Sequence, residues 1–176
     1  MASKYLSRRA FVRLGLGAGV LGASAGLGLW WLRGTAPEVQ GLGVLSAAQY
    51  RTLAALSQVH LPPCPSIAIS GVDLDLARLF DTYLFDQPPA DQSEAQLALQ
   101  LVEYGPLLFD HRLVTFSNLS ADQQLAHWTG WSRSSNATRR EIYWSFARFF
   151  GLAFYDQERV WPAIGYPGPS LARLQK

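Results

Sequence analysis

The sequence contains one cysteine, Cys64, among 176 residues, and charged side chains make up only 16% of it. A single cysteine excludes an intrachain disulfide, a Cys-x-x-Cys redox pair and a c-type haem attachment. The fold must therefore rest on packing without covalent cross-links.

Acidic residues are absent from residues 1–33, which hold five of the 15 basic ones. The other 143 residues carry 10 basic and 13 acidic side chains, a net charge of −3. Binding to phosphates needs a basic excess, which this part lacks, so we expect no nucleic-acid partner. Its length suits one domain with a hydrophobic core.

Catalytic motifs are also missing. The sequence has no Gly-x-Ser-x-Gly nucleophile elbow, P-loop or His-Glu-x-x-His pair. His60, His111 and His127 are scattered, and we expect packed or surface side chains at these positions. Asp110 and His111 are neighbours, but adjacent residues on a helix point about 100° apart. We expect no catalytic, cofactor-binding or metal-binding residue in this chain.

A twin arginine precedes the uncharged residues 14–32. The residues of this motif are Ser7, Arg8, Arg9, Phe11 and Arg13. Paired arginines at this place are typical of signals that export folded proteins through the twin-arginine translocase. The alternative is an ordinary N-terminal anchor whose basic residues keep its start in the cytoplasm.

The uncharged segment is compatible with two outcomes after export. As a helix, residues 14–32 would span about 28 Å, close to one hydrocarbon core, although six glycines weaken the segment. Ala23 and Ala25 fit a signal peptidase site, whereas the tryptophans before Arg33 resemble the interface end of a retained anchor. Both outcomes place the remainder in the periplasm or at the periplasmic face of the inner membrane.

Residues 46–176 are expected to form a single, irregular all-α domain of about five helices, behind the signal or anchor of residues 1–33 and a linker over 34–45. Helices are predicted over about 46–60, 72–86, 93–112, 120–131 and 137–155. Capping boxes begin at Ser46 and Ser120. Asp73 and Asp75 are expected in the first turn of the second helix, and Gly105-Pro106 should kink or split the third.

The helix predicted over 137–155 has large side chains on two sides. The expected core residues are Ile142, Phe146, Phe149 and Ala153, with Phe150 beside them. Trp144, Arg148 and Tyr155 lie on the opposite side, around Gly151, where a lone domain would show solvated charge. Large aromatics and arginine are enriched at protein interfaces. This side is therefore either a docking surface or is covered by the chain's own C-terminal tail.

The order of these parts resembles the gluconate 2-dehydrogenase subunit 3 family, the small accessory subunits of flavin dehydrogenases of the glucose-methanol-choline type. The resemblance rests on the twin arginine, Leu45-Ser46, Leu61-Pro62-Pro63, Leu119-Ser120, Tyr155 and Gly165-Tyr166-Pro167-Gly168-Pro169. It implies a non-catalytic subunit that binds the flavoprotein large subunit, supports its maturation and carries it out folded. FAD then belongs to the partner, and a membrane cytochrome subunit is a further partner compatible with this role.

The candidate contacts with the large subunit are Trp144, Arg148, Tyr155, Trp161 and Tyr166. The alternative is a stand-alone exported binding or scaffold protein of the cell envelope. Of the 22 aromatic residues, 14 fall between Tyr104 and Tyr166, which suits a ligand pocket as well as a subunit contact.

Replacing both Arg8 and Arg9 by Lys should hold the complex in the cytoplasm, because the signal needs the paired arginines and not their charge alone. Dehydrogenase activity in separated cytoplasmic and envelope fractions measures the effect. Unchanged activity in the envelope would show that the carrier role is wrong.

Overall fold

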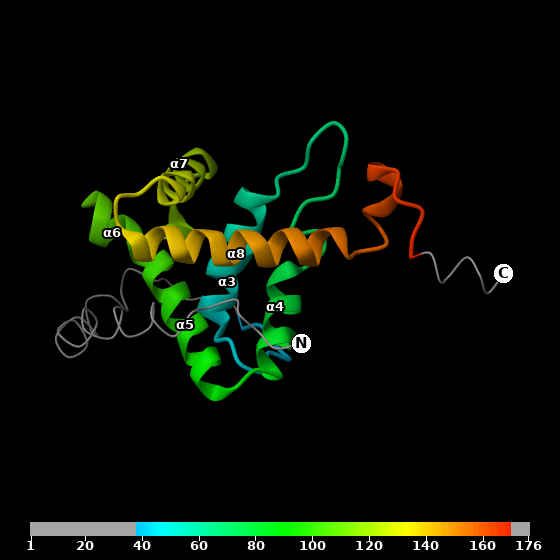
Figure 1. Cartoon of the computed structure of the whole chain (residues 1–176). Helices are drawn as coiled ribbons and strands as arrows, with labels where there is room; N and C mark the ends of the chain where they lie inside the picture. The colour runs from blue at the N-terminus through cyan, green and yellow to red at the C-terminus, as the bar shows by residue number, and fades with distance from the viewer. Residues whose placement is uncertain (1–37, 170–176) are drawn as a thin grey trace.

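The computed structural model describes residues 38–169, and this part of the chain is helical (Figure 1). Its elements are α3 (Ala47–His60), α4 (Leu76–Phe85), α5 (Pro89–Glu103), α6 (Gly105–Asp110), η1 (Phe116–Asn118), α7 (Ala121–Ser132), α8 (Ala137–Tyr155) and η2 (Trp161–Ile164). Within these residues there is no strand, only an isolated bridge between Cys64 and Ile67. The all-α prediction is confirmed for the described residues.

The N-terminal predictions lie outside the described residues. They concern the export signal (Ser7, Arg8, Arg9, Phe11 and Arg13) and the cleavage site (Ala23 and Ala25).

Two helix starts follow the predicted caps. Before α3, the Ser46 hydroxyl accepts from the Gln49 amide at 3.3 Å, and the Gln49 side chain accepts from the Ser46 amide at 2.9 Å. Before α7, the Gln123 side chain accepts from the Ser120 amide at 3.2 Å. α8 has the predicted bounds, with Asn136 as its N-cap.

The second helix begins later than predicted, at Leu76, so Asp73 and Asp75 precede it. Asp73 accepts from the amide and the hydroxyl of Ser70, at 2.8 and 2.7 Å. Asp75 has left-handed backbone, φ 47°, and caps α4 by accepting from the Arg78 amide at 3.2 Å. Short acidic side chains form such local bonds to the backbone, which compete with helix formation.

The third predicted helix is two helices, which makes six α-helices in the described chain, one more than expected. α5 begins at Pro89, because proline suits the first turn, where its missing amide proton costs no bond. Tyr104 ends α5 and precedes α6, which starts at Gly105-Pro106. The predicted break is confirmed as a split.

α8 lies across α3, α4 and α5 (Figure 1). Its fully buried residues are Ile142, Phe146, Phe150 and Phe154. The expected core positions Phe149 and Ala153 are half-buried and pack against the edge of the core. A row of residues four apart runs obliquely to the helix axis, and a helix that packs along such a row crosses its neighbours at an angle.

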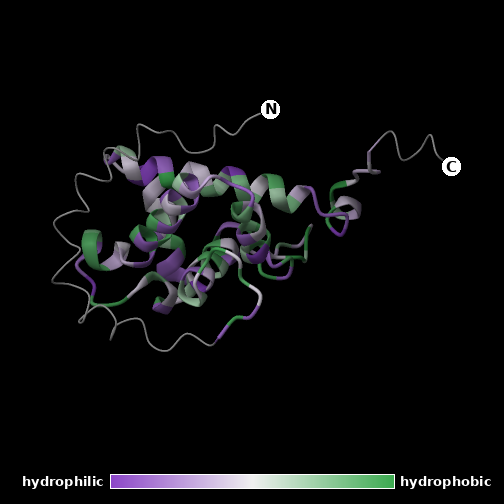
Figure 2. Cartoon of the chain, turned by 90° about the horizontal axis from the view of Figure 1, so that it is seen from below, coloured by the Kyte–Doolittle hydropathy of each residue, from purple (hydrophilic) through white to green (hydrophobic). Residues whose placement is uncertain are grey.

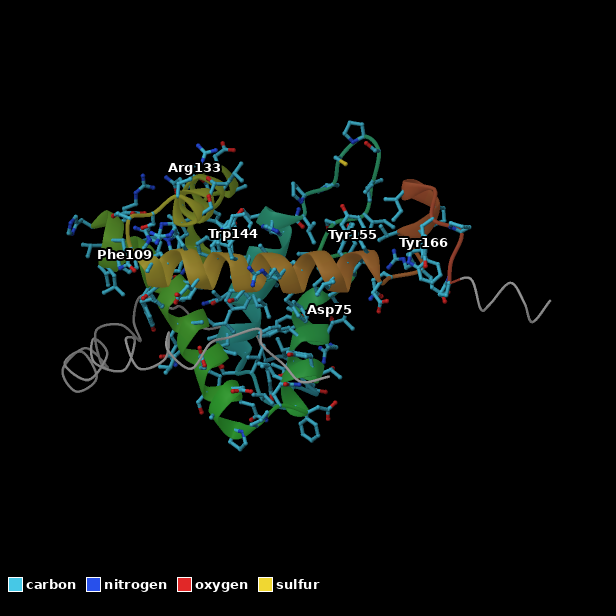
Figure 3. All side chains as sticks on the ribbon, viewed as in Figure 1. Asp75, Phe109, Arg133, Trp144, Tyr155 and Tyr166 are labelled. Carbon is cyan, nitrogen blue, oxygen red and sulfur yellow. The ribbon has the colours of Figure 1, made fainter. Side chains whose placement is uncertain are left out.

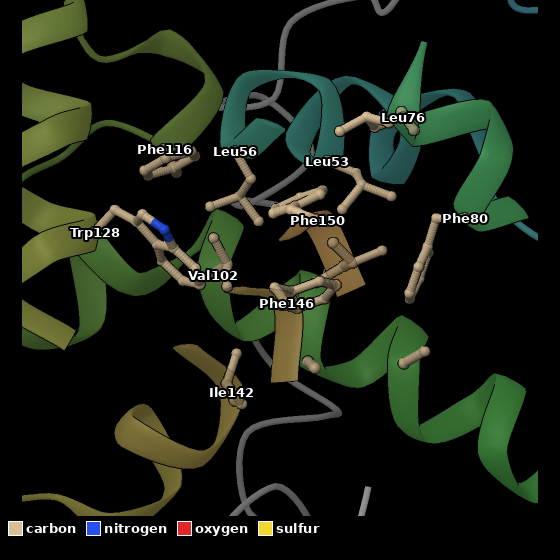
Figure 4. Packing of buried hydrophobic residues seen from close by; sticks show 14 of the residues in the cluster. Leu53, Leu56, Leu76, Phe80, Val102, Phe116, Trp128, Ile142, Phe146 and Phe150 are labelled. Carbon is tan, nitrogen blue, oxygen red and sulfur yellow. The ribbon is translucent and has the colours of Figure 1, made fainter. Parts of the chain in front are cut away.

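The buried side chains form one core in which α8 meets the other helices. Phe146 lies against Phe80 of α4, with ring centroids 5.5 Å apart (Figure 4). The Trp128 ring of α7 lies 4.8 Å from the ring of Tyr143, a partly buried residue of α8. Hydrophobic and hydrophilic residues alternate along the helices, as expected where one face is buried (Figure 2).

Part of the expected linker is packed onto this core. The buried carboxylate of Asp81 in α4 accepts from the amides of Gly43, Val44 and Leu45, at 2.7, 2.9 and 2.7 Å. Leu45 is itself buried. The packed chain therefore includes Gly43, three residues before the expected domain boundary at Ser46.

Replacing Asp81 by Ala should lower the free energy of unfolding by about 2–3 kcal/mol, because the buried amide of Leu45 and the partly buried amides of Gly43 and Val44 would lose a charged acceptor. Chemical unfolding of the full-length protein, followed by circular dichroism, measures this. Thr82→Ala, at the exposed neighbouring position of α4, is the matched control and should change stability by less than about 0.5 kcal/mol. Equal effects of the two changes would contradict the role of Asp81.

Candidate functional site

A surface hollow of about 740 Å³ lies between the C-terminal half of α8 and the segment that follows it. We call it the aromatic hollow, and its principal lining residues are Arg148, Gly151, Leu152, Tyr155, Trp161 and Tyr166. Four of the five predicted contact residues are thus brought together. The fifth, Trp144, lies outside the hollow but on the same face of α8, since it precedes Arg148 by four residues (Figure 3).

The wall beyond α8 is fixed by hydrogen bonds. The Trp161 indole donates to the Tyr155 carbonyl at 3.0 Å, and the Tyr166 amide donates to the Trp161 carbonyl at 2.9 Å. The two rings of Trp161 and Tyr166 meet edge to face, 5.3 Å apart. Gly168 has φ 91°, and a Cβ there would lie 3.3 Å from the Trp161 ring. Both the backbone conformation and the close ring therefore favour glycine at this position.

The hollow exposes apolar surface beside a free cation. Tyr155 is 50% exposed, and Tyr166 is 44% exposed. Arg148 is exposed and makes no hydrogen bond or ion pair with any residue of 38–169. Trp144 is 51% exposed, so the tail as far as Pro169 does not cover this face. This side of α8 was expected either to be a docking surface or to be covered by the C-terminal tail, and the tail as far as Pro169 leaves it exposed.

Gly151 forms part of the floor of the hollow. A Cβ built on it meets no atom within 4 Å, although the residue lies inside α8. Glycine inside a helix is unfavourable by about 1 kcal/mol relative to alanine. Neither a positive φ nor crowding by the described residues explains glycine at position 151.

A second cavity, which the sequence did not predict, lies between α4, α5 and α8. We call it the apolar groove; it measures about 400 Å³, and its floor is formed by Phe80, Tyr83, Ala95, Phe146, Phe149 and Ala153. Leu152 and Asp156 line both the groove and the aromatic hollow, so the two are adjacent. The signal in the sequence that could have indicated the groove is that α8 carries more apolar residues than a single buried row needs.

A third, smaller hollow, which we call the polar hollow because charged side chains line it, borders His127. It measures about 330 Å³ and is lined by charged residues that include Asp110, Arg112, Asp122 and Arg139. Arg139 lies over the Phe109 ring at 4.6 Å and the Trp131 ring at 5.2 Å. Asp110 and His111 are neighbours in the sequence and were not expected to act as a pair, and in the structure Asp110 pairs with His127, 17 residues away.

Both nitrogens of the His127 ring are engaged inside the protein. Nε2 accepts from the Trp131 indole at 3.1 Å, so the ring proton is on Nδ1, which donates to the Asp110 carboxylate at 2.6 Å. Burial lowers the pKa of His127, and Asp110 offsets this effect only in part. The side chain is 2% exposed. His127 is therefore a packed, neutral side chain, as expected, and it does not present a lone pair to the hollow.

Metal ligands do not gather within residues 38–169, where no group of three or more His, Cys, Asp and Glu is placed to hold an ion. None of the helices in this range combines the length and apolarity needed to cross a membrane. The chain matches no family model, no curated protein and no solved structure. The chemistry of the hollow and the groove must therefore be inferred from their own residues.

Lowering the pH from about 7.5 to about 5.5 should reduce the free energy of unfolding, because His127 takes up a proton in the unfolded chain near pH 6.5 and only at lower pH when folded. Burial lowers the pKa of His60 too, which acts in the same direction. His127→Gln should make this dependence shallower. His111→Gln, at an exposed position, is the matched control. Equal slopes for His127→Gln and the unmodified protein would show that His127 is not held neutral.

Proposed function

We propose that this chain is the non-catalytic small subunit of an exported flavin-dependent dehydrogenase. It binds the large subunit through the aromatic hollow, supports its maturation and carries it in folded form through the twin-arginine route. The observation that carries the proposal is the exposed row of Trp144, Arg148, Tyr155 and Tyr166 along α8 and the segment after it (Figure 3). FAD belongs to the large subunit in this proposal.

The composition of the hollow supports a protein partner. Full burial of a large apolar side chain stabilises an association by about 1.5–3 kcal/mol, and tyrosine, tryptophan and arginine are the residues that most often dominate binding energy. Tyr155 and Tyr166 leave about half of their surface available for burial. An acidic or carbonyl group of the partner would accept hydrogen bonds from the guanidinium of Arg148, which has no acceptor among residues 38–169.

The geometry of the hollow also favours binding with little ordering cost. Trp161 is tied to α8 through the Tyr155 carbonyl and to the following turn through the Tyr166 amide. A surface that is already ordered loses less conformational entropy when a partner binds.

The N-terminal sequence supports the carrier part of the proposal. A flavoprotein that folds around its cofactor before export needs a route for folded proteins, and Arg8 and Arg9 address such a route. A large subunit without its own signal can then travel on this one. The complex is accordingly placed in the periplasm or at the periplasmic face of the inner membrane.

The alternative is a stand-alone exported binding or scaffold protein of the cell envelope, and one observation favours it. The apolar groove, at about 400 Å³, lies within the size range of small-molecule pockets. In that case no flavoprotein accompanies the chain.

Replacing Gly151 by Leu should abolish co-purification of a flavoprotein with the full-length chain, because the new side chain fills the floor of the hollow. It should not destabilise the fold, because the Cβ meets no neighbour within 4 Å and leucine is the better helix former. Pull-down from native membranes in mild detergent, with the flavin absorbance of the eluate, measures binding. Circular dichroism on heating measures stability.

Gly130→Leu is the matched control. Gly130 also lies inside a helix, α7, and a Cβ there also meets no atom within 4 Å, but it borders the polar hollow. This variant should retain the flavoprotein. If Gly151→Leu retains it equally well, the partner does not dock in the aromatic hollow.

A further inference from the structure

We propose that the apolar groove is a second docking surface, which takes an amphipathic helix of a partner polypeptide whose apolar side is flanked by lysine or arginine. The inference rests on the proposed function only in that the occupant belongs to a partner protein. It concerns a surface that none of the five predicted contact residues lines.

The shape of the groove is elongated along α8. Its lining residues on this helix run from Ile142 to Asp156, a distance of about 21 Å at 1.5 Å per residue. On the side opposite α8, α4 and α5 contribute Phe80, Tyr83 and Ala95 to the lining. A trough of this length matches about four turns of a helix laid along it.

The floor of the groove is apolar and ordered by ring contacts. Phe149 meets Phe80 edge to face at 4.7 Å and lies 5.8 Å from the Tyr83 ring. Leu152, at the boundary with the aromatic hollow, is 62% exposed. These side chains present the kind of surface on which one apolar face of a helix packs, with anchors at positions i, i+3, i+4 and i+7.

The walls of the groove favour a helical segment over an extended one. All three elements that form it are helices, whose backbone groups are already bonded within each helix except at the ends. An extended segment would find few backbone partners there and would leave its own amides and carbonyls unsatisfied. A helix satisfies its backbone internally and needs only side-chain contacts.

The charge around the groove specifies the flanks of the occupant. Asp91 and Asp156 are the charged residues among those that line it, so no lysine or arginine of the described chain does. Glu94 of α5 is buried, and burial together with the nearby carboxylates of Asp91 and Glu141 raises its pKa. An acidic border with no lysine or arginine among its described lining residues complements a helix that carries basic residues next to its apolar side.

Photo-crosslinking in the native host tests this proposal on the full chain. Phe149→p-benzoylphenylalanine places the reactive group in the groove, and Trp144→p-benzoylphenylalanine places it on the exposed face outside. Position 149 should link to a segment of another polypeptide. Mass spectrometry of the linked peptide should find apolar residues at helical spacing with an adjacent lysine or arginine.

Charge variants provide the second measurement. Asp91→Lys with Asp156→Lys should lower the crosslinking yield at position 149 by about tenfold, because repulsion replaces attraction. Glu38→Lys with Asp122→Lys makes the same change of net charge at two exposed acids outside the groove and should leave the yield unchanged. Circular dichroism of each variant shows whether helical content is retained.

Several outcomes would overturn the proposal. The first is a link from position 149 to residues of this chain, to a lipid or to a small molecule. The second is a linked segment of another polypeptide that has no basic residues. The third is the absence of any crosslinked product at position 149. A flavoprotein captured at position 144 but not at 149 would refute the groove proposal and leave the proposed function standing. A basic helix captured at position 149 from a protein without flavin would support the groove proposal and refute the proposed function.

Discussion

The position of α8 in the bundle governs most of the described structure. Its buried row, Ile142, Phe146, Phe150 and Phe154, contacts α4 through Phe80 and α3 through His60, whose ring lies 5.7 Å from Phe150. Because residues four apart advance by about 40° around a helix, the buried row turns along its length. The aromatic hollow and the apolar groove are consequently two neighbouring faces of one helix, which meet at Leu152.

Two buried carboxylates fix how the helices are held relative to one another. Asp81 joins α4 to the chain before α3, and Glu103 joins α5 to α3 and η1 by accepting from the hydroxyls of Thr52 and Ser117, at 2.9 and 2.7 Å. Helices held only by apolar packing can slide past one another more readily than helices joined by these hydrogen bonds, because hydrogen bonds require particular distances and angles. The walls of the groove are therefore set by polar contacts as well as by the core.

Local signals in the sequence predicted the elements that depend on local chemistry. The capping residue Ser46, the break at Gly105-Pro106 and the full extent of α8 follow from backbone and capping preferences. The start of α4 could not be predicted in this way, because Asp75 adopts a left-handed backbone conformation that the spacing of apolar residues does not reveal.

Features that depend on tertiary contacts were not predictable in the same way. Which of Phe149 and Phe150 is buried depends on the angle at which α8 crosses its neighbours. The groove and the Asp110–His127 pair also arise from segments that the chain brings together only on folding. The gathering of Arg148, Tyr155, Trp161 and Tyr166 was expected only as a shared surface, and the hydrogen bonds of Trp161 give it a concave form.

The Asp81 contact has a mechanical consequence for the N-terminal side of the chain. A pull on the backbone before Gly43 first acts on the hydrogen bond from the Gly43 amide to Oδ2 of Asp81. It acts only afterwards on the hydrogen bonds from the Val44 and Leu45 amides to Oδ1 of Asp81. These bonds would rupture one after another while the helices behind them stay assembled. Force applied to the chain before Gly43 thus acts on the bonds to one carboxylate before it acts on the packing of the helices.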